Sequence, residues 1–324
     1  MGCGAGAITE AYRFRSGLIV CGAAPSRASL MAWRPEGARV TEGMRTHGEL
    51  SGLDAAAVRA AIRAGAYARH TAGLAPGRLQ CNLAILPERH APEFLRFCAR
   101  NPGPCPVVAV GRPGDPSLPS LGAGIDVRTD VPRYRVFRDG ALDRVAGDIS
   151  GLWADDLVTV ALGCSFTFER ALAEAGIPLR HVERDLTVPM FRTSIPLAPA
   201  GPFGGEMVVS MRPIPEGRVA DAIAISAAYP QAHGAPVHAG DPYAIGIADL
   251  SRPDWGDAVE VRPGEVPLFW ACGVTPQNVL LAARLPLVIT HEPGCMLIAD
   301  LGERDAPSMS PFNENQKQGD RPDA

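Results

Sequence analysis

DLVTVALGCSFTFERALAEAGIP, residues 156–178, decides the fold class of this chain. The apolar run at its start is typical of a buried strand, and Gly163 followed by Cys164 and Ser165 marks a tight turn. A helix follows, and Gly176 with Pro178 ends it. A strand that passes directly into a helix predicts an α/β fold, whose sites form beyond the carboxyl ends of the strands.

The same order of elements recurs at residues 265–301. This segment predicts a strand, a turn at Gly273, and a helix with Thr275 as N-cap and Pro276 at its first position. A second strand follows and ends at His291. The two segments place five candidate site residues near strand ends: Cys164, Ser165, Cys272, Thr275 and His291.

Other segments extend this alternation. Residues 54–70 predict an amphipathic helix with Asp54 as N-cap. A strand at 79–87, a helix at 91–101 and a strand at 105–111 predict a βαβ-like unit. Further predictions are a hairpin turning at Asp139-Gly140, and two strands joined by a proline-rich connection at 205–230.

The ends of the chain lack this regularity. Residues 1–50 show no sustained periodicity and predict a poorly defined N-terminal extension. Residues 303–324 are polar and predict a disordered tail. The α/β domain is therefore expected to span residues 51–302.

Composition excludes several classes of protein. The 324 residues are 46% hydrophobic with a net charge of −4, which favours a globular domain and gives no basic footprint for nucleic acid. No apolar run reaches the roughly 18 residues of a membrane span. The eight cysteines show no zinc-type or iron–sulfur spacing. We expect a cytoplasmic protein without a metal or cofactor.

Two cysteines lie at predicted helix starts. A thiol there meets free backbone N–H groups and the positive end of the helix dipole, so Cys164 in GCSFTFE and Cys272 in ACGVTPQ are candidates for proton transfer or nucleophilic chemistry. The side chains of Thr275 and Gln277 would line the same pocket. A serine hydrolase is disfavoured because its nucleophile motif needs glycine where Thr167 stands. The alternative is that Ser165 only caps the helix and Cys164 only packs.

The stretch HGAPVHAGDP, residues 233–242, contains His233, His238 and Asp241. On a straight strand the two histidines would point to opposite faces, so a joint role requires the chain to bend. No metal-ligand spacing is present, and Asp241-Pro242 is typical of a turn. Three interpretations stay open: a metal site, which is the least favoured, a hydrogen-bonding scaffold, and acid–base or substrate contact.

Two arginines stand among apolar residues, Arg192 in VPMFRT and Arg212 in VVSMRP. A buried guanidinium needs a carboxylate, supplied by the protein or by a ligand. Thr193, beside Arg192, is a further candidate for substrate binding. Asn82 and Asn101 are interpreted as loop organisers rather than catalytic residues.

Taken together, LGCSFTFERALAEAGIPLRH, VPMFRT, VVSMRP, HGAPVHAGDP, PLFWACGVTPQ and ITHEPGCMLIADL resemble the hydro-lyase family related to D-glutamate cyclase. The resemblance is collinear from about residue 53 to residue 301 and is specific because the motifs are dense. The sequence departs from the family pattern at Cys295, where histidine is usual, and at Thr167, where serine is usual.

The resemblance implies a three-layer α/β/α domain with a smaller inserted α+β subdomain, roughly at residues 112–205. It also implies a soluble lyase acting on a small carboxylate. The reaction would be dehydration, or water-eliminating cyclisation of a D-glutamate-like amino acid to 5-oxoproline.

These observations define the candidate site. The candidate catalytic residues are Cys164, His233, His238, Cys272 and His291. The candidate substrate-binding residues are Ser165, Arg192, Thr193, Arg212, Asp241, Thr275 and Gln277. The expected partner is a small carboxylate substrate, with a homodimer left open. Two alternatives remain, a cysteine-dependent hydrolase or racemase-like enzyme and a non-catalytic carboxylate-binding protein.

Overall fold

The computed structural model describes residues 43–184 and 186–305. The compact unit begins at Gly43, ahead of the predicted boundary at residue 51. Most of the predicted extension, residues 1–42, and the predicted tail from residue 306 onward lie outside the described residues. Helix α1 (His47–Leu50) buries Leu50 in an apolar cluster with Val58 of helix α2 (Ala55–Arg63). The predicted N-cap Asp54 is confirmed, because its carboxylate accepts a hydrogen bond from the Ala57 N–H at 2.7 Å.

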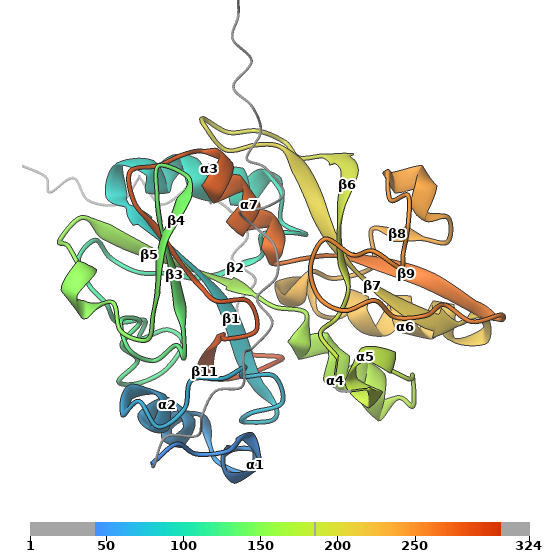
Figure 1. Cartoon of the computed structure of the whole chain (residues 1–324), viewed down its shortest axis with the longest axis horizontal. Coiled ribbons are helices and arrows are strands. Elements are labelled where there is room, and N and C mark those ends of the chain that lie inside the picture. The colour runs from blue at the N-terminus through green and yellow to red at the C-terminus, as the bar shows by residue number, and fades with distance from the viewer. Residues whose placement is uncertain (1–42, 185, 306–324) are drawn as a thin grey trace, which may run out of the picture. The chain divides into compact units, whose positions relative to one another are not determined.

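The first sheet has seven strands in the order β2-β5-β1-β10-β3-β4, with β11 also paired to β1 (Figure 1). Its strands are β1 (Arg78–Pro87), β2 (Val107–Val110), β3 (Tyr134–Arg138), β4 (Ala141–Ala146), β5 (Leu157–Gly163), β10 (Val288–His291) and β11 (Leu297–Gly302). Every pair is antiparallel. The predicted order of strand, helix and strand at 79–111 is confirmed with helix α3 (Ala91–Arg100). Strand β5 lies between β1 and β2, which therefore run in the same direction without pairing.

The second sheet has four antiparallel strands in the order β6-β7-β9-β8. Its strands are β6 (Met190–Pro196), β7 (Glu206–Pro215), β8 (His238–Ala239) and β9 (Glu265–Ala271), and the remaining helices are α4 (Phe166–Glu174), α5 (Arg180–Glu183), α6 (Val219–Ala227) and α7 (Val274–Ala282). The second strand predicted within 205–230 is wrong, because residues 219–227 form α6. This segment is rich in alanine, and its buried Ala222 and Ser226 are separated by one helical turn.

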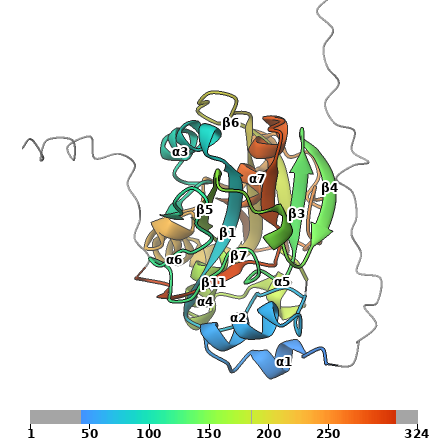
Figure 2. The ribbon, with the colours of Figure 1, turned by 90° about the vertical axis from the view of Figure 1, so that its left-hand side faces the viewer.

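Each sheet is covered differently on its two faces. Helices α3 and α7 pack on one face of the first sheet, and the other face packs against segments between residues 118 and 153 (Figure 2). Helices α4 and α6 pack on one face of the second sheet, and residues 245–261 pack on the other. The described residues thus combine helices with antiparallel sheets, and the three-layer arrangement is not confirmed. The chain passes from the first sheet to the second after Gly163 and returns to the first at β10, and the insertion at 112–205 stays a prediction.

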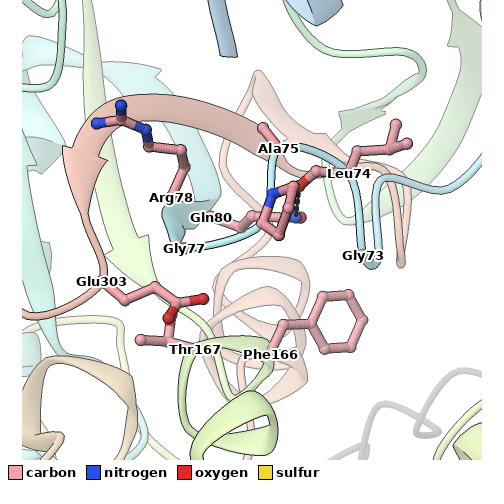
Figure 3. Close-up of a pocket in the computed structure, with 10 residues that line it drawn as sticks. Gly73, Leu74, Ala75, Gly77, Arg78, Gln80, Phe166, Thr167 and Glu303 are labelled. Atoms are coloured by element: carbon pink, nitrogen blue, oxygen red, sulfur yellow. Dashed lines mark hydrogen bonds between the residues drawn. The ribbon is translucent and has the colours of Figure 1, made fainter. Parts of the chain in front are cut away.

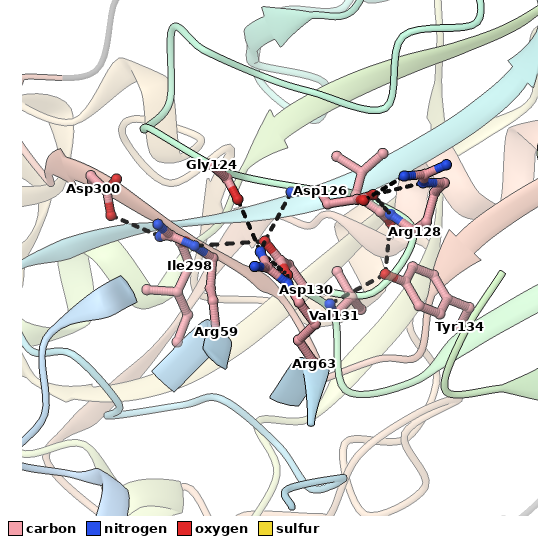
Figure 4. A network of polar contacts seen from close by, with 11 residues as sticks. Arg59, Arg63, Gly124, Asp126, Arg128, Asp130, Val131, Tyr134, Ile298 and Asp300 are labelled. Atoms are coloured by element: carbon pink, nitrogen blue, oxygen red, sulfur yellow. Dashed lines mark hydrogen bonds and ion pairs between the residues drawn. The ribbon is translucent and has the colours of Figure 1, made fainter. Parts of the chain in front are cut away.

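A buried carboxylate fixes α2 to the rest of the unit. Asp130 is fully buried and accepts hydrogen bonds from Arg63 at 2.8 Å, with the guanidinium of Arg59 3.7 Å away (Figure 4). Arg59 also pairs with Asp300 of β11 at 2.8 Å. Because a buried charge is costly without partners, this network holds α2, β11 and the loop carrying Asp130 in one arrangement. Among the described helices, none is both long and apolar enough to cross a bilayer.

Candidate active site

Strand β7 places Arg212 on the helix-covered face of the second sheet, where it is 0% exposed. Its Nε donates to Glu169 Oε1 at 3.0 Å, and its Nη2 donates to the same oxygen. The remaining contacts are to Ser210 Oγ at 3.0 Å and Ser165 Oγ at 3.3 Å. Of the two partners that the sequence leaves open for Arg212, the structure provides the protein carboxylate.

Glu169 is the centre of this polar cluster. Its Oε1 also lies 3.1 Å from His181 Nε2. Burial alone would raise the pKa of Glu169, but the charge of Arg212 and the nearby His181 together lower it to about 2. Glu169 is therefore a carboxylate at neutral pH. No hydrogen bond from a described residue reaches its second oxygen, Oε2.

His233 brings an unpartnered nitrogen to the same cluster. Its Nδ1 lies 2.8 Å from the Gly103 carbonyl oxygen, which can only accept, so Nδ1 carries the hydrogen and Nε2 keeps its lone pair. Nε2 is buried and has no partner among the described residues. The backbone is also left-handed at φ 77°, an uncommon conformation for a residue with a side chain. Burial, together with the Arg212 charge and opposed by the Gly103 hydrogen bond, lowers the pKa of His233 to about 4.

Two thiols flank the cluster from different sheets. Cys164 follows β5 and lies beside the Phe166 N–H at the start of α4, whereas Cys272 follows β9 and lies beside the N–H groups of Val274 and Gly273 at the start of α7. Burial raises the pKa of Cys164 to about 12 and that of Cys272 to about 11. Both are therefore protonated at neutral pH and can donate hydrogen bonds. The structure thus brings together Cys164, Ser165, Arg212, His233 and Cys272.

Thr275, Gln277 and His291 form a separate set of contacts that holds α7 in place. The hydroxyl of Thr275 bonds to the N–H and carbonyl of Val208, at 3.0 and 3.1 Å. The predicted N-cap is therefore wrong: Gly273 occupies that position. His291 Nδ1 accepts from the Leu83 N–H at 3.1 Å, and its Nε2 lies 3.3 Å from the Gln277 amide. With both ring nitrogens partnered, His291 acts as scaffold in this structure.

His238 and Asp241 lie away from the cluster, contrary to prediction. His238 is paired with Phe269 of β9, and residues directly opposite each other in a sheet share a face. Phe269 packs on the sheet face opposite to Arg212 and its neighbour Trp270. The Asp241 side chain accepts from the Tyr243 N–H at 3.0 Å, which forms an ordinary turn.

Arg192 and Thr193 also differ from prediction. Arg192 is half exposed, with its guanidinium 4.9 Å from the Trp255 ring centroid and 3.7 Å from Asp254. Trp255 packs against the apolar cluster that contains Cys272, so Arg192 lies at the solvent side of the site. The Thr193 hydroxyl donates to the Met207 carbonyl at 2.8 Å within the sheet. It is a structural contact at the irregular pairing of β6 with β7.

A small cavity adjoins the first turn of α4 on its other side. It measures about 50 Å³ and is lined by residues 73–78, Gln80, Phe166, Thr167 and Glu303 (Figure 3). The Thr167 hydroxyl is buried without a partner among the described residues. This volume suits one or two water molecules rather than a substrate.

Three polar residues of the cluster were not predicted: Glu169, His181 and Ser210. Glu169 could have been found, because it lies at helical spacing with the apolar Leu172 and so on the buried face of α4. Ser210 and Arg212 are two residues apart on β7 and therefore lie on the same face of the sheet, which is another local pattern. Nothing local indicates His181, since its contact with Glu169 depends on how α5 packs. Within residues 43–184 and 186–305, no group of His, Cys, Asp and Glu could hold a metal ion.

We expect the protein to lose stability as the pH falls from about 6.5 to 4. Burial lowers the pKa of both His233 and His291 to about 4, against roughly 6.5 in an unfolded chain, so the unfolded state binds more protons in this window. At pH values above about 6.5, each histidine should contribute on the order of 3 kcal/mol to the free energy of unfolding. This contribution is lost progressively as the pH falls to about 4. Denaturant unfolding at a series of pH values measures the loss. His233→Gln should reduce the slope and the partly exposed control His238→Gln should not; equal slopes in all three proteins would contradict the expectation.

Comparison with known proteins adds family information to this geometry. A sequence profile described as D-glutamate cyclase matches residues 158–300. A relative from Jannaschia sp. (strain CCS1), named "Putative hydro-lyase", is 69% identical over 253 residues, which cover 78% of this chain and 95% of the relative. A "Putative hydro-lyase" from Dinoroseobacter shibae is 55% identical over 289 residues, which cover 89% of this chain and 96% of the relative.

A solved structure, a nitrogen repressor-like protein from Methanococcus jannaschii, aligns with 72% of this chain and 91% of its own. Its TM-score is 0.33 at 10% sequence identity, and it carries no argument about fold or function.

Proposed function

Because the chain belongs to the D-glutamate cyclase family of hydro-lyases, we propose that it removes water from a small carboxylate substrate at the cluster around Arg212. The reaction is dehydration of a hydroxy acid or cyclisation of a D-glutamate-like amino acid to 5-oxoproline. The observation that carries the proposal is His233 Nε2, a buried imidazole nitrogen that has a lone pair and no partner among the described residues. A group of this kind is costly to bury and is suited to accept a proton from a bound molecule.

In either reaction His233 takes protons from the substrate and gives them back. In cyclisation, the substrate ammonium loses one proton to Nε2, the amine forms a bond to the distal carboxyl carbon, and the nitrogen then loses a second proton. The carbon–oxygen bond breaks after both protons have passed to the leaving oxygen. In dehydration, Nε2 takes a proton from the carbon next to the carboxylate as the hydroxyl leaves. The leaving oxygen is protonated in both cases and departs as water, so the imidazole returns to its neutral state.

The substrate carboxylate binds where the first turns of α4 and α7 meet. The N–H groups of Phe166 and Val274 lie beside thiol sulfurs, which are weak acceptors, so a carboxylate oxygen is a better partner for them. The neutral thiols of Cys164 and Cys272 donate hydrogen bonds to the same oxygens. Arg212 contributes indirectly, because Glu169 already neutralises it and the cluster remains uncharged before substrate binds.

The rival function of a cysteine nucleophile is less well supported. A nucleophilic thiol needs a pKa near or below neutrality, whereas the pKa values of Cys164 and Cys272 are raised by burial to about 12 and about 11. A binding protein without activity would need no unpartnered base. The raised pKa values and the free imidazole nitrogen therefore favour acid–base elimination.

The test is incubation of the full chain with D-glutamate, L-glutamate and a panel of 2- and 3-hydroxy acids. Mass spectrometry should detect a product lighter by one water from at least one of them. The same incubation with His233→Gln should give little product, which separates enzymatic from spontaneous cyclisation. Absence of water loss from every compound, or equal loss with His233→Gln, would overturn the proposal.

A further inference from the structure

Asn82 lies between the two turns that carry the thiols. It belongs to β1 and points to the sheet face on which α7 packs, so it is not the loop residue that the sequence suggests. Its Nδ2 donates to the Gly163 carbonyl at 2.7 Å, directly before Cys164. Its side chain also reaches Gly273, directly after Cys272: a Cβ at Gly273 would lie 2.5 Å from Asn82 Nδ2 and 2.8 Å from Oδ1.

The approach of Asn82 to Gly273 requires glycine. Real Cβ atoms essentially never come so close to another heavy atom, so any other residue at 273 would displace the amide. The contact places the amide against the start of α7, while its hydrogen bond holds it against the start of α4. One β1 side chain thus joins the two helix starts.

The amide of Asn82 has one atom without a partner among the described residues. Nδ2 donates to Gly163, and no described residue donates a hydrogen bond to Oδ1. Asn82 is only 5% exposed. Oδ1 is not one of the fully buried unpartnered atoms of the described residues, so it stays accessible and can receive an N–H or O–H group from a bound molecule.

We propose that Asn82 is a substrate-binding residue whose Oδ1 accepts a hydrogen bond from the amino or hydroxyl group of the carboxylate substrate. This inference rests on the proposed function for the identity of the substrate. The carboxylate binds at the starts of α4 and α7, and Asn82 between them selects ligands that carry a donor near the carboxylate. A ligand with hydrogen in place of that donor leaves Oδ1 unpaired and binds more weakly.

Binding of three ligands of equal carbon skeleton tests this selection: D-glutamate, 2-hydroxyglutarate and glutarate. Calorimetry on the full chain carrying His233→Gln measures dissociation constants without turnover. D-Glutamate should bind between about tenfold and a hundredfold more tightly than glutarate, because its donor is charged. 2-Hydroxyglutarate should bind only about twofold to tenfold more tightly than glutarate, because its donor is neutral.

Asn82→Ala should remove both preferences while the affinity for glutarate stays within about threefold. Gly273→Ala provides a second route to the same loss, since its Cβ displaces the amide, and it serves if Asn82→Ala does not fold. The matched control is Asn101→Ala, a buried asparagine whose amide bonds only to backbone groups of Phe97 and Ala198. This control should keep both preferences.

If Asn82 has only a structural role, Asn82→Ala should weaken the binding of all three ligands equally. That result would overturn the proposal. The proposal would also be overturned if the chain that carries only His233→Gln bound the three ligands equally, or bound none of them. These outcomes are independent of turnover. If the unmodified chain removes water from no compound, the proposed function fails, yet a preference that depends on Asn82 would still support the binding role.

Discussion

His233→Gln is expected to lower kcat/KM for the water-eliminating reaction by about a hundredfold to ten-thousandfold, the usual contribution of a general base. Glutamine can replace the hydrogen bond to the Gly103 carbonyl, but its amide cannot take up a proton. The loss should appear mainly in kcat, because the substituted atom acts on the reacting proton rather than on the carboxylate. Steady-state kinetics on the best substrate of the panel measures it.

His238→Gln is the matched control for this prediction. It makes the same chemical change at a histidine that lies on the opposite face of the second sheet. Its kcat/KM should stay within about twofold of the unmodified protein. If His233→Gln also retains activity within about threefold, His233 is not the base and the site must be assigned differently.

Glu169→Gln is expected to destabilise the protein by about 3–5 kcal/mol. The substitution keeps the shape of the side chain but leaves the fully buried guanidinium of Arg212 without a countercharge. Urea unfolding, followed by circular dichroism, gives the change in the free energy of unfolding. A double variant, Arg212→Met with Glu169→Leu, should recover much of the loss, because apolar pairs often replace buried ion pairs without cost.

The control for Glu169→Gln is an exposed ion pair. Arg218 and Asp221 are 2.8 Å apart at the start of α6, with both side chains in contact with solvent. Asp221→Asn should cost less than about 1 kcal/mol, since water screens this pair. A loss for Glu169→Gln no greater than that for Asp221→Asn would mean that the Arg212 cluster is hydrated.

Local sequence patterns predict where helices and strands lie better than they predict which strands and side chains those elements contact. Asp54 was identified as an N-cap because the hydrogen bond that defines it spans three residues. Thr275 carries the same signal, yet its hydroxyl bonds to Val208 of a distant strand, and only the packing of α7 on β7 decides this. The helical spacing of α6 was present in the sequence but was outweighed by the neighbouring strand pattern. Strands β1 and β2 both pair with β5 rather than with each other, and no local pattern in the sequence indicates this.

For the candidate site, too, local patterns indicate some residues, whereas contacts between distant segments decide the others. Cys164 and Cys272 could be placed at helix starts because a strand that turns into a helix is a local pattern, whichever sheet the strand belongs to. His233 and His238 were indistinguishable in sequence. The pairing of His238 with Phe269 separates them, and the contact of His233 with Gly103 selects its free nitrogen. These contacts join residues 31 and 130 positions apart and have no periodicity.

The position of β1 in the first sheet has a consequence for how the chain acquires its structure during synthesis. Ala84 of β1 pairs with Thr290 of β10, so this edge of β1 has no partner until nearly the whole unit has left the ribosome. Contacts so distant along the chain slow folding, and an unpaired apolar strand can meanwhile associate with other chains. The late pairing of β1 with β10 should therefore limit how fast this protein folds after synthesis.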